Sequence, residues 1–90
     1  MKAFIIERDL PGIGSAGDDD LAAAAGTSNA ALAQLAPRVQ WQHSYVTGDR
    51  TYCVYLAQDE EAIREHARIS GFPATKIVQI AGRIDPTTAR

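Results

Sequence analysis

The side chains with the widest chemical range lie in one stretch of the sequence. They comprise an indole, an imidazole, a hydroxyl, three phenols and a thiol, at Trp41, His43, Ser44, Tyr45, Tyr52, Cys53 and Tyr55. Imidazole and thiolate are good ligands for nickel, zinc and copper, and two neighbouring strands can hold them rigidly. The stretch therefore indicates a metal site, provided that the fold brings His43 and Cys53 together.

The segments that carry these side chains are expected to form a β-hairpin. Residues 39–45 alternate in polarity with a period of two, and residues 51–56 are rich in strand-forming types. Gly48-Asp49 between them supplies a turn.

The register of this hairpin decides whether the two candidate ligands meet. A two-residue turn pairs Thr47 with Arg50 and places His43 and Cys53 on opposite faces of the sheet. A three-residue loop with a bulge pairs Thr47 with Thr51 and places both on one face. The sequence leaves both registers open, although the first gathers the more apolar set, which is Trp41, Tyr45, Tyr52, Val54 and Leu56.

Several of these residues also have a purely structural interpretation. Free cysteine is among the most buried residue types, so Cys53 also fits a small core position. His66 has no second histidine four residues away, which predicts a helix-surface position or a hydrogen-bonded edge. Ser44 beside His43 is a poor catalytic dyad, because adjacent strand residues point to opposite faces.

Two helices and two further strands are expected around the hairpin. Residues 3–7 and 76–80 are short apolar runs typical of buried strands, and the second could extend to Ile84. Helical spacing predicts one helix over residues 21–35 and another over residues 60–70. The expected helix boundaries are an acidic run at Asp18–Asp20 and a stop at Pro37 for the first, and Asp59 and Gly71 for the second.

The order β-α-β-β-α-β predicts an α+β fold of the ferredoxin-like sandwich type. Right-handed crossovers then give a four-stranded antiparallel sheet with both helices on one face. Ninety residues are enough for one domain, residues 1–90. The uncovered face of such a sheet normally finds a partner, so we expect a homodimer.

Composition excludes several classes of partner. The net charge is −2 and no cluster of Lys and Arg is present, so nucleic acid is not an expected ligand. The apolar start of the chain is too short for a signal peptide or a membrane span, which predicts a cytoplasmic protein that binds no membrane. The single cysteine agrees with a reducing compartment.

The order of several motifs resembles a known family. The motifs are Trp41-Gln42-His43-Ser44-Tyr45-Val46, Tyr52-Cys53-Val54-Tyr55, Glu61-Ala62-Ile63-Arg64, Gly71-Phe72-Pro73 and Ile84-Asp85-Pro86. In this order they are similar to a family of small bacterial proteins described as nickel-binding or nickel-responsive. The resemblance implies a ferredoxin-like sandwich, a homodimer and nickel(II) binding in at least one member of the family.

The resemblance carries over only to matching positions, which are His43, Ser44, Tyr45, Cys53 and Tyr55. Among these His43 is the best ligand in chemical terms and Cys53 the second, and Glu7 on the adjoining strand could complete the set with water. We therefore expect a nickel-binding protein that catalyses no reaction.

Two other functions remain open. In a dimeric α/β-barrel enzyme or small-molecule-binding protein, His43, Tyr45 and Tyr55 would line a pocket with Ser44 nearby, and His43 would act as acid or base. In an interaction module, the hairpin aromatics would form the dimer surface.

Overall fold

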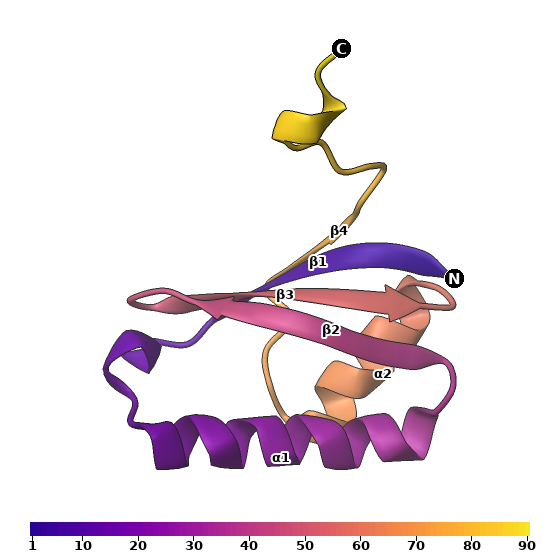
Figure 1. Ribbon diagram of the computed structural model, residues 1–90. Coiled ribbons are helices and arrows are strands. Elements are labelled where there is room, and N and C mark those ends of the chain that lie inside the picture. The colour runs from indigo at the N-terminus through magenta and orange to yellow at the C-terminus, as the bar shows by residue number, and fades with distance from the viewer.

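The computed structural model describes residues 1–90 and has two helices packed on one face of a four-stranded antiparallel sheet (Figure 1). The strands lie side by side in the order β2-β3-β1-β4. The element bounds are β1 (Lys2–Asp9), α1 (Asp18–Leu35), β2 (Val39–Val46), β3 (Arg50–Ala57), α2 (Glu60–Ser70) and β4 (Lys76–Gln79), with short 3-10 helices at Ile13–Ser15 and Pro86–Thr88. This arrangement confirms the predicted ferredoxin-like α+β sandwich.

The two helices begin in different ways. The carboxylate of Asp59 accepts a hydrogen bond from the backbone N–H of Ala62 at 2.9 Å, as expected for the start of α2. Gly71, with φ of +80°, ends this helix. The acidic run was expected to cap α1 and to oppose its N-terminal dipole. The capping is wrong, because the N-cap is Gly17 and no side chain caps it. Asp18–Asp20 do form the first turn, where their negative charges interact favourably with the helix dipole.

The hairpin adopts the two-residue turn. The backbone N–H of Thr47 donates to the carbonyl of Arg50 at 2.9 Å, and His43 lies opposite Val54. The pairing shifts by one residue between Trp41 and His43, which marks a β-bulge at Gln42. The expected unbroken alternation along β2 is therefore wrong, since the bulge moves Trp41 to the other face from His43.

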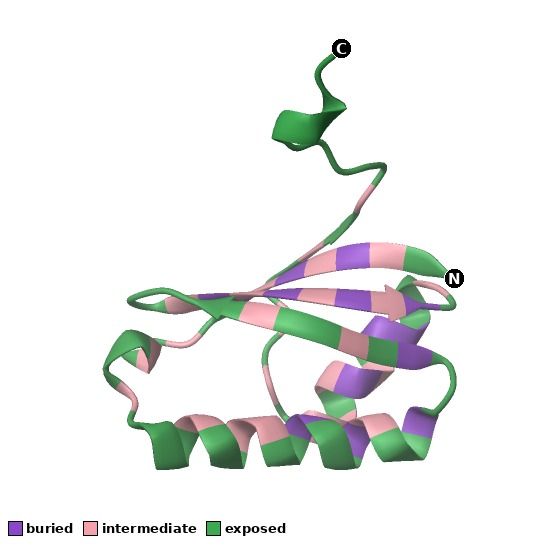
Figure 2. Ribbon diagram, viewed as in Figure 1, coloured by how far each residue is buried: buried purple, intermediate pink, exposed green.

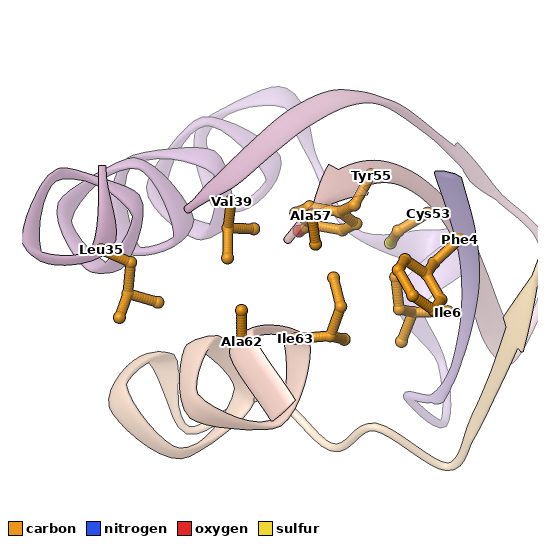
Figure 3. Close-up of a cluster of buried hydrophobic side chains, with 9 residues drawn as sticks. All are labelled: Phe4, Ile6, Leu35, Val39, Cys53, Tyr55, Ala57, Ala62 and Ile63. Atoms are coloured by element: carbon orange, nitrogen blue, oxygen red, sulfur yellow. The ribbon is translucent and has the colours of Figure 1, made fainter. Parts of the chain in front are cut away.

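The core lies between the sheet and the helices (Figure 3). Along β3 every second residue is buried, and the buried positions of β1 follow the same alternation (Figure 2). Both helices cover this side, which we call the inner face. The core cluster consists of Phe4, Ile6, Leu35, Val39, Cys53, Tyr55, Ala57, Ala62 and Ile63.

The opposite side of the sheet, here called the outer face, carries neither α1 nor α2 (Figure 1). Strand β4 ends at Gln79 and does not continue to Ile84, because the last ladder contact is the hydrogen bond from Ile80 N–H to the Ala3 carbonyl at 2.8 Å. The chain then leaves the sheet on its outer side (Figure 1). Neither helix combines the length and apolar character that a membrane crossing requires.

Candidate functional site

His43 lies on the edge strand β2 and is exposed on the outer face. Its ring meets the ring of Tyr45 edge to face, with centroids 5.2 Å apart and planes at 77°. Tyr45 is itself 63% exposed. The structure therefore presents an accessible imidazole beside a phenol, on a strand with no neighbour on its outer edge.

Glu7 also belongs to the outer face, but it lies on β1, two strands away from β2. Neighbouring strands are about 4.8 Å apart, so roughly 10 Å separates the backbones that carry Glu7 and His43. The Glu7 carboxylate pairs with the guanidinium of Arg50 at 3.0 Å, and Arg50 also contacts Asp9 at 2.6 Å. Within one chain, this carboxylate is engaged with an arginine and stands apart from the imidazole.

Cys53 lies on the inner face and is buried. It pairs with Ser44 and not with His43. Its thiol donates to the hydroxyl of Thr51 at 3.5 Å, within the core. Because His43 projects from the other side of the sheet, Cys53 and His43 of one chain cannot bind the same ion.

The donor set for a metal is thus incomplete within a single chain. No group of three or more His, Cys, Asp or Glu side chains comes together. His43 is the one candidate ligand that is both exposed and free of an ion pair. A site built on it needs donors from water or from a second chain.

A pocket of about 210 Å³ lies on the inner face, between α1 and the sheet. Ten of its fourteen lining residues are hydrophobic. The lining includes four of the residues singled out in the sequence, which are Trp41, Ser44, Cys53 and Tyr55. Tyr45 and His43 lie on the other side of the sheet. The bulge helps to shape the pocket, because it turns Trp41 inward, where its indole N–H donates to the Ser44 hydroxyl at 2.9 Å.

Arg8 is the charged residue in the pocket lining, and it is only 2% exposed. Its Nη1 donates to the carbonyl oxygen of Pro73 at 2.8 Å, and Nη2 has no hydrogen-bond partner. The guanidinium carbon lies 5.9 Å from the centre of the Tyr55 ring and 6.0 Å from that of Phe72. None of the ion pairs in the chain involves Arg8, so the guanidinium is a buried charge without a counter-charge.

Three polar side chains meet beside this guanidinium. The Ser28 hydroxyl on α1 lies 3.2 Å from Nε2 of His66 on α2 and 3.5 Å from the Tyr55 hydroxyl on β3. Burial raises the pKa of Tyr55. Burial also lowers the pKa of His66, and the positive charge of Arg8 lowers it further. The phenol and the imidazole are therefore held in their neutral forms.

Arg8, a pocket residue, was not among the residues singled out in the sequence, and His66 lies elsewhere than expected. The expectation of a surface or edge position for His66 is wrong, because this residue is 1% exposed and faces the core with Ile63. Arg8 follows Phe4 and Ile6 at a spacing of two, and this alternation places all three side chains on one face of β1. That spacing is the signal from which a buried arginine could have been predicted.

Comparisons with known proteins agree on the fold and point to one family. A family model described as "Nickel responsive protein SCO4226-like" matches residues 4–80. The crystal structure of SCO4226 from Streptomyces coelicolor A3(2) aligns with a TM-score of 0.77 and 16% sequence identity, covering 91% of this chain and 99% of that chain. At this identity the structural likeness shows the fold alone. No curated protein matches the sequence.

Proposed function

This chain belongs to the SCO4226-like family of nickel-responsive proteins, and from that premise we propose that it binds Ni²⁺ through the imidazole of His43 without catalysing a reaction. The observation that carries this assignment is the exposed His43 ring on the uncovered outer face. Imidazole nitrogen combined with oxygen donors suits Ni²⁺.

The proposed site is completed by a second copy of the chain. One chain brings no three ligands together, so a stable site needs further donors. The outer face carries exposed apolar side chains, among them Tyr45 at 63% and Val78 at 42% exposure. Packing two such faces together removes this surface from water and brings a second His43 to the same interface. Water and outer-face carboxylates such as Glu7 then supply oxygen donors.

Calorimetric titration with Ni²⁺ tests the role of His43. The wild-type protein is expected to bind Ni²⁺, and His43→Ala is expected to bind at least about tenfold more weakly, because it loses a direct ligand. Gln40→Ala is the matched control, since Gln40 is also exposed on the outer face of β2. Equal affinity of His43→Ala and the wild-type protein would refute the assignment.

Cys53→Ser tests whether the thiol contributes. Because Cys53 is buried on the face opposite His43, this variant is expected to keep its nickel affinity. A loss of nickel binding in a Cys53→Ser protein that unfolds like the wild type would move the site to the inner face.

A further inference from the structure

We propose that the inner-face pocket is a binding site for a small carboxylate with an apolar body, and that the guanidinium of Arg8 is its counter-charge. The proposed ligand class is an aromatic or short branched monocarboxylate. The site is separate from the proposed nickel site, because the sheet lies between the pocket and His43.

Arg8 carries a buried positive charge that no acidic side chain neutralises. A guanidinium stays protonated in proteins, and a buried charge is costly unless it is paired and hydrogen-bonded. Arg8 is 2% exposed, has one Nη nitrogen without a partner and forms no ion pair. Its Nη1 is partly satisfied by the Pro73 carbonyl. A carboxylate entering the pocket supplies the missing negative charge and accepts from the guanidinium, the pairing that arginine geometry favours.

The side chains that line the pocket are mostly apolar. Ten of the fourteen lining residues are hydrophobic, including Leu21, Trp41 and Phe72. Such walls suit the apolar body of a ligand. The hydroxyls of Ser28, Ser44 and Tyr55 also line the pocket and can hydrogen-bond to one polar end.

The volume of the pocket limits the size of the ligand. The pocket measures about 210 Å³. An apolar cavity of about 150 Å³ is sufficient for benzene. One aromatic ring with a carboxylate attached therefore fits, whereas larger cofactors do not.

Benzoate and its uncharged analogue benzyl alcohol are the probes that test this site. Trp41 is the single tryptophan and lines the pocket, so its fluorescence reports occupancy directly. Titration of the wild-type protein is expected to show saturable binding of benzoate with a Kd on the order of 1 mM or below. Benzyl alcohol is expected to bind about 10- to 100-fold more weakly, because its hydroxyl carries no negative charge to pair with the guanidinium. This comparison needs no variant.

Two pairs of variants locate the ligand. Arg8→Gln is expected to lose the preference for benzoate over benzyl alcohol, whereas Arg64→Gln, at an exposed position of α2, keeps it. Ala25→Leu fills the pocket and is expected to abolish binding of both probes with the charge intact. Ala22→Leu makes the same change at an exposed position of α1 and leaves binding unaltered.

The proposal is overturned if wild-type protein shows no saturable response to benzoate at concentrations on the order of 10 mM. It is also overturned if benzyl alcohol binds as tightly as benzoate, or if Ala25→Leu binds like the wild type. Because none of these outcomes depends on nickel, a failure here leaves the assignment of His43 untouched.

Discussion

At the scale of single residues, the interior holds two polar side chains with one nitrogen each that lacks a partner. These nitrogens are Nη2 of Arg8 and Nδ1 of His66. Buried polar atoms are satisfied in the great majority of cases, so each exception calls for a physical reason. For Arg8 the reason we infer is that its guanidinium binds a carboxylate ligand. For His66 the consequence is a dependence of stability on pH.

The neutral state of buried His66 predicts that the protein loses stability in mild acid. Its pKa is lowered in the folded state by burial and by the charge of Arg8, so the unfolded chain binds the proton more readily. The free energy of unfolding therefore falls as the pH drops below the unfolded histidine value of about 6.5 and continues to fall until the folded-state pKa is passed. Tyr55, with its raised pKa, stays neutral throughout this range.

Urea unfolding between about pH 5 and pH 8 measures this dependence. His66→Gln is expected to reduce the change in the free energy of unfolding with pH. His43→Asn, which removes the exposed histidine on the outer face, is expected to leave that change as in the wild type. If the free energy of unfolding of His66→Gln depends on pH as steeply as that of the wild type, a group other than His66 causes the dependence.

Replacing Arg8 tests whether this residue is kept for stability or for binding. Arg8→Met removes an unpaired buried charge and keeps an unbranched apolar side chain in its place. Without added carboxylate, we expect the free energy of unfolding to rise by about 1 kcal/mol. Thermal and urea unfolding give the value. A decrease in the free energy of unfolding of similar size would contradict this. It would mean that the hydrogen bond to Pro73 and the contacts with Tyr55 and Phe72 stabilise the protein by more than the burial of the charge costs.

At the scale of elements, the order of helices and strands followed from the periodicity of the sequence, and so did the ends of α2. The sequence left two registers of the hairpin open, and the structure has the one with a two-residue turn at Gly48-Asp49. The apolar set expected for that register does not share one face, because Trp41 lies on the inner face and Tyr45 on the outer face. The bulge at Gln42 could not be predicted, because its sequence pattern is that of a regular strand. The bulge is set by tertiary packing that turns the Trp41 ring toward Tyr55, whose ring centroid is 6.5 Å away.

Two glycines in different backbone states give opposite expectations for one substitution. Gly26 lies at an exposed position inside α1, where an added Cβ meets nothing within 4 Å. Gly26→Ala is expected to raise the free energy of unfolding by about 1 kcal/mol, which is the difference in helix propensity. Gly71→Ala is the matched control and should lower it, since φ of +80° strains any residue with a Cβ. A stabilising Gly71→Ala would contradict the left-handed end of α2.

At the scale of the whole molecule, one sheet separates two surfaces of different character. The inner face holds the core and the pocket, and the outer face holds His43 and is covered by neither α1 nor α2 (Figure 1). The sequence pointed to His43 by residue type and resemblance, but whether it joins Cys53 depended on the register. Arg8 was overlooked because a charged residue near a strand end reads as exposed, and only its spacing from Phe4 and Ile6 indicates otherwise.

The outer face predicts self-association. Val78 lies on this face of β4 and is 42% exposed. Val78→Lys places a charge in the proposed interface and is expected to shift a dimer toward monomer, as measured by sedimentation velocity. Gln79→Lys, next to it on the opposite face of β4 and also exposed, should leave the mass unchanged. A wild-type protein that stays monomeric at micromolar concentration would contradict the proposed dimer.

Native mass spectrometry of the protein titrated with Ni²⁺ tests most directly whether His43 binds nickel between two copies of the chain. It reports the number of chains and the number of metal ions in the same particle. We predict a dimer that takes up nickel in a defined step, and a His43→Ala protein that remains a dimer and takes up none. Nickel bound to single chains, or equal uptake by His43→Ala, would contradict it.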